Sequence, residues 1–237
     1  MTASGKTVAI LQSNYIPWKG YFDIIHDVDE FIFHDYLQYT KKDWRNRNLI
    51  KTPKGTEWLT VPVGTSQHRL ICEVAINDLK WQAEHWRIIQ QHYSRAPHFS
   101  QYRAFFEEFY LASKWDNLSE MNQHLIKRIS RELLGVHTEF PTSREYPPTG
   151  EKMDRLIYLL KEAQATTYVS GPSGKDYIDP RRLEEAGIAL VWKDYSGYPE
   201  YQQFFGPFTH QVSILDLLFQ VGPAAPEHVW GWRERRA

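Results

Sequence analysis

The sequence predicts an α/β protein with a parallel or mixed sheet, flanking helices, and a helical insert or subdomain in the middle of the chain. Short apolar runs typical of buried strands alternate with helix-like spacing near both ends. Helical spacing alone runs from residue 79 to 134, and the proline-containing stretch 139–150 is the best internal boundary. We therefore expect residues 1–78 (a βαβ unit plus a hairpin) and 149–237 to build the core, and residues 79–148 to form the insert.

The N-terminal elements follow from short-range patterns. Residues 7–12, TVAILQ, are a short apolar run and predict a buried strand. Apolar residues then recur at helical spacing over 21–28, and EFIFHDY at 30–36 predicts a second strand. A strand, a helix and a strand within this length form a βαβ unit with parallel strands and a right-handed crossover. The runs EWLTVPV (57–63) and LICEVAI (70–76), joined by a polar loop, predict a β-hairpin.

The later elements are predicted in the same way. Ser213 stands where an N-cap would begin the helix ILDLLFQVG, and Gly222 lies just beyond its end. The other expected elements are helices within 81–93, 99–112, 117–134 and 151–165, and strands at 166–171 and 188–195.

Composition limits the class of protein. A formal net charge of −1 over 237 residues gives no overall field for DNA or an anionic membrane. A single cysteine, Cys72, excludes an intrachain disulfide, and we interpret it as a buried strand residue. The first apolar run is too short for a secretory signal, and no run approaches the ~20 apolar residues of a spanning helix. We expect a cytoplasmic protein without membrane insertion.

Aromatic residues are abundant: nine Trp, fourteen Tyr and twelve Phe. Many stand beside charges, as in KKDWRNRN and DYSGYPEYQQFF. Rings with one apolar face and a polar edge suit sugars and nucleobases, although each could equally mark the border between core and surface.

The first candidate site joins the loop after the first strand with the segment after the second. Carboxyl ends of neighbouring parallel strands face one crevice, so these two segments should converge. Lysine and arginine there suit phosphate groups, and the alternative is a solvated basic turn with ion pairs. The residues are Asn14, Tyr15, Trp18, Lys19, His34, Asp35, Gln38, Tyr39, Lys41, Lys42, Asp43, Trp44, Arg45, Asn46, Arg47 and Asn48.

The second candidate is a glycine-containing turn after the strand at 166–171. Such a turn exposes backbone N–H groups to an anion, but it lacks the GxxxxGK[ST] spacing, and the alternative is a tight structural turn. Its residues are Ser170, Gly171, Ser173, Gly174, Lys175 and Tyr177.

The third candidate is His210, which precedes the helix that begins after Ser213. A helix N-terminus disfavours the charged imidazole, so His210 could act as a neutral base. The alternative is a purely structural helix start. No metal site is indicated, because the ten histidines include no HExxH or HxH, and neither GxSxG nor GxGxxG occurs.

Together these segments resemble the WbqC-like protein family. The resemblance rests on QSNYIPWKGYFDII, QYTKKDWRNRNLIK, WLTVPV, YVSGPSGKDYID and SILDLLFQVG, in order from about residue 8 to 222. The family commonly has proline where this chain has Ser13.

The resemblance implies transfer of an acyl or aminoacyl group, glycyl among them, to an amine on a nucleotide-linked amino sugar for a bacterial surface polysaccharide. The donor would be an adenylate made with ATP, a thioester or an aminoacyl-tRNA, and the near-neutral charge disfavours the last. Asn14, Tyr15, Trp18 and Lys19 would wall the pocket; Lys41, Arg45, Arg47 and the turn from Gly171 to Gly174 would hold phosphates; and His34, Asp35 or His210 would be the base. The alternatives are an ATP-dependent amide ligase of secondary metabolism and a non-catalytic nucleotide-sugar-binding protein.

Overall fold

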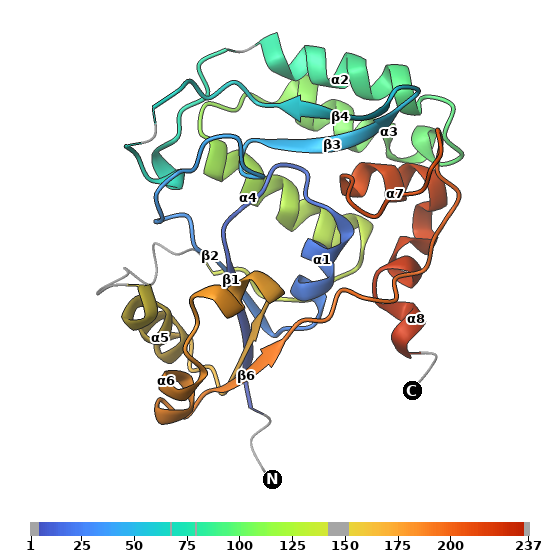
Figure 1. Ribbon diagram of the computed structural model, residues 1–237. Helices are drawn as coiled ribbons and strands as arrows, with labels where there is room; N and C mark the ends of the chain where they lie inside the picture. The colour runs from blue at the N-terminus through green and yellow to red at the C-terminus, as the bar shows by residue number, and fades with distance from the viewer. Residues whose placement is uncertain (1–4, 67, 79, 142–151, 235–237) are drawn as a thin grey trace.

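A four-stranded parallel sheet organises the chain, as Figure 1 shows. The computed structural model describes residues 5–66, 68–78, 80–141 and 152–234. The strands are β1 (Thr7–Leu11), β2 (Glu30–Phe33), β5 (Thr167–Ser170) and β6 (Ala189–Trp192), in the order β2-β1-β5-β6 with every neighbour parallel. Helix α1 (Lys19–His26) connects β1 to β2. The α/β class and the parallel βαβ unit are therefore confirmed.

Helices cover both faces of the sheet because successive strand residues point to opposite sides. Val8 and Ile10 share a hydrophobic cluster with α5 (Lys152–Glu162) and α6 (Pro180–Glu185). Ala9, between them, belongs to the larger cluster on the side of α1. This alternation leaves both faces of the sheet covered by apolar side chains.

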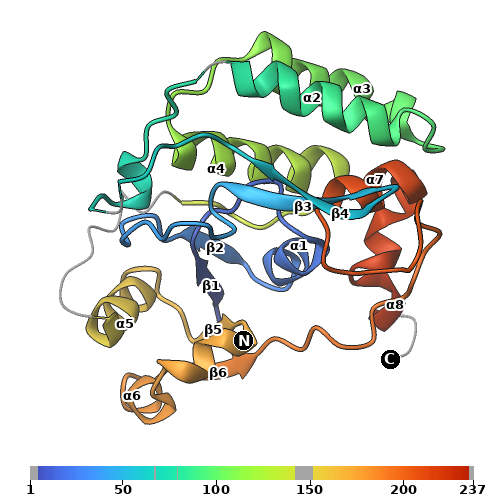
Figure 2. The same cartoon turned by 45° about the horizontal axis from the view of Figure 1, so that its top comes forward.

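The middle of the chain lies beyond the carboxyl ends of the sheet strands (Figures 1 and 2). It contains the antiparallel hairpin of β3 (Arg47–Thr52) and β4 (Gly55–Thr60), and helices α2 (Lys80–Tyr93), α3 (Phe99–Glu107) and α4 (Leu118–Arg128). The π-helical segments Glu108–Ala112 and Ile129–Leu133 continue α3 and α4. Apolar residues of this helical region share one cluster with α1 and with the later helix α7 (Ile214–Val221).

The predicted hairpin between 57–63 and 70–76 is wrong in its partner. The first run contains most of β4, but β4 pairs with Arg47–Thr52 through the two-residue turn 53–54, after which Gly55 opens β4 with φ +108°. The second run holds only the 3₁₀ turn Ile71–Glu73, so Cys72 is half-buried in that turn and not in a buried strand. Apolar residues of the second run, such as Val74, pack in the core without joining a sheet. Their apolar pattern in the sequence is therefore the same as that of a buried strand.

The chain from β6 to α7, residues 193–213, forms no helix or strand element of its own. Ser213 caps α7 as predicted, because its Oγ accepts from the Leu215 N–H at 3.2 Å, and Gly222 follows with φ +61°. The 3₁₀ segment Gly222–His228 and helix α8 (Gly231–Glu234) complete the described chain.

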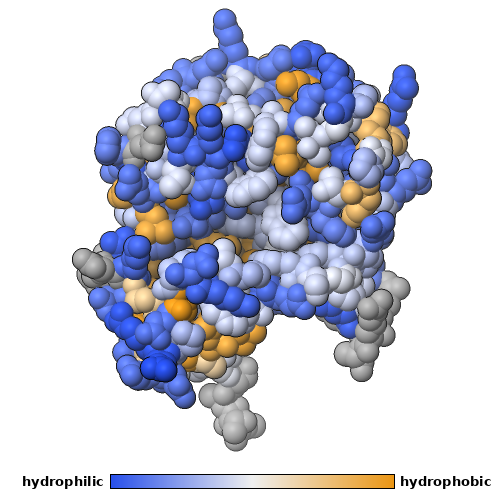
Figure 3. All heavy atoms as spheres, in the orientation of Figure 1, coloured by the Kyte–Doolittle hydropathy of each residue, from blue (hydrophilic) through white to orange (hydrophobic). Residues whose placement is uncertain are grey.

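The surface is mainly polar on the face seen in Figure 3. Apolar atoms gather at the lower left of that view, where Figure 1 places α5, α6 and β6. No helix in the described part of the chain is both long enough and apolar enough to cross a membrane.

Candidate functional site

The sheet has a topological switch point between β1 and β5. The connection through α1 leads from β1 to β2 on one side, whereas β5 and β6 lie on the other. Ligands of open α/β sheets bind outside the carboxyl ends of strands at such a point. A pocket of about 470 Å³ is built largely from the loop after β1 and the segment after β6. Its lining residues are Asn14, Pro17, Trp18, Trp44, Asn48, Tyr195, Tyr198, His210 and Gln211.

Buried hydrogen bonds hold the loop after β1 in one shape. Asn48 Nδ2 donates to the carbonyls of Tyr15 (3.0 Å) and Ile16 (2.9 Å). Ile16 has φ +34°, which a β-branched residue adopts only when its surroundings impose it. The Ser13 N–H donates to Asp35 Oδ1 at 2.8 Å, a bond that a proline at this position could not make. The first wall of the pocket is therefore set by Asp35, which follows β2, and by Asn48 of β3.

Arg45 ties the loop after β1 to the segment that precedes β3. Its Nη1 donates to Asn14 Oδ1 at 2.7 Å and its Nη2 to Gln12 Oε1 at 3.1 Å. The carbonyl of Trp44 accepts from the Tyr15 N–H at 3.0 Å. Both terminal nitrogens thus donate to neutral side chains, and Nη2 also lies 3.6 Å from Asp43 Oδ2. Arg45 therefore organises the pocket wall through Asn14.

The second wall is segment 193–213, which buried polar contacts fix along its length. Lys193 pairs with Asp23 at 2.9 Å, and the Tyr198 hydroxyl also donates to Asp23. Further along, Tyr201 Oη donates to Asp216 Oδ1 at 2.8 Å. A long irregular segment held so firmly is typical of a functional loop.

His210 projects from this wall into the lining of the pocket. Its Nδ1 is buried and has no hydrogen-bond partner among the residues that the structure describes. Burial lowers the pKa of His210 to about 4, with a further contribution from the nearby Lys19 ammonium. The imidazole packs against Phe208 (ring centroids 4.6 Å apart) and Tyr198 (6.0 Å). His210 is therefore neutral near pH 7 and has a free nitrogen.

Lys19 lies behind the same wall and is only 3% exposed. Its Nζ donates to the Pro199 carbonyl at 3.3 Å and stands 4.7 Å from the centroid of the Tyr198 ring. No ion pair within the described chain includes Lys19. Burial lowers its pKa to about 8, although Asp23 acts in the opposite direction. Because no ion pair among the described residues offsets its charge, the Lys19 ammonium raises the electrostatic potential at His210.

Two further predicted site residues, His34 and Asp35, follow β2 and lie outside the pocket lining. Asp35 is buried and, besides the bond from Ser13, accepts hydrogen bonds from Ser119 and Gln123 of α4. It therefore holds the loop after β1 against α4. Burial lowers the pKa of His34 to about 4, with a further contribution from Arg155.

Tyr15 and its neighbours in the predicted set turn towards the interior. The Tyr15 hydroxyl is fully buried, 2.8 Å from His85 Nδ1 and 2.6 Å from Tyr110 Oη. Tyr39 Oη donates to Asn46 Oδ1 at 3.0 Å, which holds the segment before β3. On the outside of that segment lie the exposed Gln38 and Lys41, the partly buried Arg47, and Asp43, whose Oδ1 accepts from the Trp44 N–H.

The turn after β5 approaches the pocket at one point. An added Cβ at Gly171 would lie 3.5 Å from Tyr195 Oη, so this glycine borders the pocket wall. At Gly174 an added Cβ would lie 2.4 Å from Ser170 Oγ, so packing explains that glycine. Ser173, Lys175 and Tyr177 are exposed on the 3₁₀ turn Pro172–Asp176 and just after it, and none of them lines the pocket.

Comparison with known proteins places the chain in a family. Residues 12–228 match the WbqC-like protein family. The chain belongs to the WbqC-like protein family. It is 47% identical over 226 residues to the uncharacterized protein Rv1507c of Mycobacterium tuberculosis, an alignment that covers 94% of this chain and 97% of the relative. No solved structure matches this chain.

Four pocket residues of this WbqC-like protein were not among the candidate site residues chosen from the sequence: Pro17, Tyr195, Tyr198 and Gln211. The aromatic run DYSGYPEYQQFF contains both tyrosines and was the available signal. Burial raises the pKa of each phenol, and Asp23 adds to the effect, so both hydroxyls stay protonated near pH 7.

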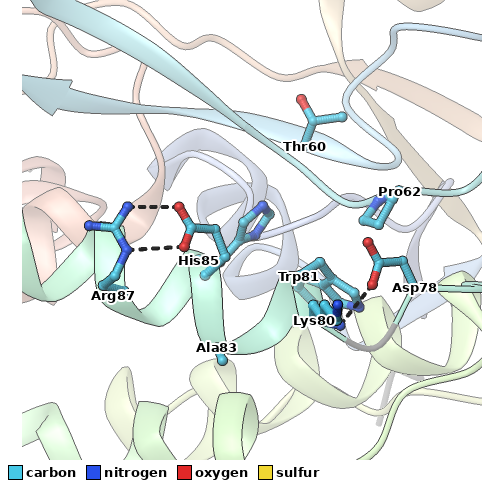
Figure 4. A pocket seen from close by; sticks show the side chains of 9 residues that line it. Thr60, Pro62, Asp78, Lys80, Trp81, Ala83, His85 and Arg87 are labelled. Carbon is cyan, nitrogen blue, oxygen red and sulfur yellow. Dashed lines mark hydrogen bonds and ion pairs between the residues drawn. The ribbon is translucent and has the colours of Figure 1, made fainter.

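Two other hollows fit a ligand less well. One of about 600 Å³ lies between the end of β4 and α2, shown in Figure 4. Its Arg87 donates to both oxygens of Glu84 (3.0 and 2.7 Å), and its His85 is engaged by Tyr15. Another, of about 670 Å³, lies beside β5, β6 and α8, where Lys193 and Arg233 are paired with Asp27. No group of three or more potential metal ligands occurs among the described residues.

Proposed function

We propose that this WbqC-like protein is a transferase that forms an amide by passing an acyl or aminoacyl group, glycyl among them, to an amine. The acceptor would be an amino sugar linked to a nucleotide, for a surface polysaccharide. The observation that carries the proposal is His210: a neutral imidazole with a buried, unpartnered nitrogen in the lining of a pocket at the switch point.

Amide formation needs a base at the attacking nitrogen. The neutral amine attacks the acyl carbonyl carbon, a C–N bond forms, and the bond to the carrier oxygen or sulfur breaks. His210 accepts the proton that the amine loses and can return it to the departing group. Because its pKa is lowered to about 4, His210 is available as a base across the neutral range.

The rest of the pocket supplies orientation. The Asn14 side chain accepts from Arg45, and within the described chain no other hydrogen bond is made by the side chain of Asn14 or of Gln211. Their remaining donors, with the phenol of Tyr195, can hold the hydroxyl groups of a sugar. Trp18, which meets Tyr195 edge-to-face at 5.2 Å, offers an apolar ring for the sugar face.

The test supplies glycyl donors of three kinds, a thioester, a glycyl-tRNA and glycine with ATP, with a nucleotide-linked 4-amino sugar as acceptor. Mass spectrometry detects the amide. His137→Gln is the matched control for later work on His210, because His137 is exposed and remote in the sequence from the pocket residues.

Amide from a preformed donor without ATP supports the transferase. Amide that requires ATP and free glycine, with release of AMP, overturns it in favour of the ligase. Binding of the nucleotide sugar without product from any donor overturns it in favour of a non-catalytic binding protein.

A further inference from the structure

Two indole rings stand exposed beside the pocket. Trp44 is 41% and Trp58 is 42% exposed, and their ring centroids are 5.2 Å apart with the planes inclined at 48°. Trp44 also lines the pocket, so the paired rings extend one of its walls outward. Adjacent exposed indoles leave a large apolar area in water, which is typical of a binding surface.

The backbone beneath these rings is rigid. The Trp44 N–H donates to Asp43 Oδ1 at 2.7 Å, and the Trp44 carbonyl accepts from the Tyr15 N–H at 3.0 Å. Trp58 lies in β4, opposite Leu49 of β3. Rings on a fixed backbone lose little conformational entropy when a ligand stacks on them.

Positive charge lies beside Trp58 and along the segment that carries Trp44. The Arg47 guanidinium lies 4.0 Å from the centroid of the Trp58 ring, and Arg47 donates to the Lys42 carbonyl. Lys41 and Lys42 are exposed, and Lys42 is held at φ +58°, outside the usual region for a lysine. Although the whole chain carries a net charge of −1, this segment is locally basic.

We propose that Trp44 and Trp58 form a stacking subsite for a nucleobase, with Lys41, Lys42 and Arg47 beside its phosphates. An exposed aromatic ring next to cations matches a base joined to phosphate, and a neutral sugar would not need the cations. The inference rests on the proposed function for the role of the adjoining pocket, and it names the carrier that brings a reacting group there.

The experiment measures binding by calorimetry of UMP, AMP, a short single-stranded oligoribonucleotide and N-acetylglucosamine. The variants are Trp44→Ala and Trp58→Ala, and circular dichroism verifies their folding. Leu111→Ala is the control, because Leu111 is another exposed apolar residue (54%) that does not line the pocket. Trp44→Phe keeps a stacking ring and tests whether the ring itself matters.

Loss of one stacking contact should weaken binding of the nucleotides by about 5-fold or more. We expect that loss in both alanine variants, little change in Leu111→Ala, and partial recovery in Trp44→Phe. Tighter binding of the oligoribonucleotide than of UMP and AMP would assign the base to an RNA end, and equal binding would assign it to a free nucleotide carrier.

Three results would overturn the inference: no nucleotide binding by the native protein, equal binding by the alanine variants, or N-acetylglucosamine binding that depends on the two indoles as strongly as nucleotide binding does. The same measurements distinguish failure of this inference from failure of the proposed function. Nucleotide binding that requires Trp44 and Trp58, without any amide formation, keeps the inference and rejects the transferase. Amide formation on an amine that carries no nucleotide, with no nucleotide binding, keeps the transferase and rejects the inference.

Discussion

Replacing Asn48 with alanine tests how the pocket loop is held. Asn48 is 2% exposed, and its Nδ2 is the donor to the carbonyls of Tyr15 and Ile16. Both of those residues are buried, so water cannot readily replace the amide. The substitution therefore leaves two buried carbonyls without this donor.

The magnitude follows from those two groups. A buried polar group left unsatisfied costs about 1–3 kcal/mol, so the loss at two carbonyls in Asn48→Ala should lower the free energy of unfolding by about 2–6 kcal/mol. For a chain of this length the corresponding fall in Tm is roughly 4–24 °C, at ~2–4 °C per kcal/mol. The strained backbone of Ile16, at φ +34°, is then free to relax and to move Asn14 and Trp18.

The assay is urea unfolding at pH 7 followed by fluorescence, with Thr56→Ala as the control. Thr56 lies on the same hairpin with its side chain exposed, so its replacement should cost no more than about 1 kcal/mol. An Asn48→Ala protein as stable as the control would refute the view that this side chain holds the loop.

Three further predictions follow from buried charges. Lys19→Met should raise the pKa of His210 while leaving it below 6.5, since burial remains the larger cause; an NMR titration that shows no rise contradicts this. Asp23→Ala should lower the free energy of unfolding by about 3–5 kcal/mol, measured with urea, because Lys193 and Arg233 both lose a buried partner. Burial lowers the pKa of His85 to about 4, so neutral His85 stabilises the fold fully above pH 6.5, and this stabilisation is lost as the pH falls. Between pH 7 and pH 5 the free energy of unfolding should fall by about 2 kcal/mol from this group. His85→Gln should remove that part of the pH dependence in urea unfolding.

The sequence predicted those elements whose signals are local. β1, α1 and β2 follow from apolar spacing, and the Ser213 cap follows from a side chain two residues from its partner. β3 gave no such signal, because buried polar residues interrupt it. Lys51 is 1% exposed and donates to the Pro207 carbonyl at 2.6 Å, a partner that only the folded chain brings near.

The candidate site was predictable to a similar degree. Asn14, Trp18, Trp44, Asn48 and His210 were singled out from the sequence, and the fold gathers them around one pocket. The opposite wall has no periodic pattern, since contacts with distant residues such as Asp23 and Asp216 determine its course. The role of Asp35 was equally hidden, because two of its donors lie on α4.

The most direct test of the proposed transferase is the rate of amide formation by His210→Gln at pH 7 with saturating donor and acceptor. Removal of a general base typically slows a reaction by about 10²–10⁴-fold. We predict at least a 100-fold slower rate for His210→Gln and an unchanged rate for His137→Gln. Equal rates for His210→Gln and the native protein would contradict the assignment of His210 and, with it, the account of the pocket.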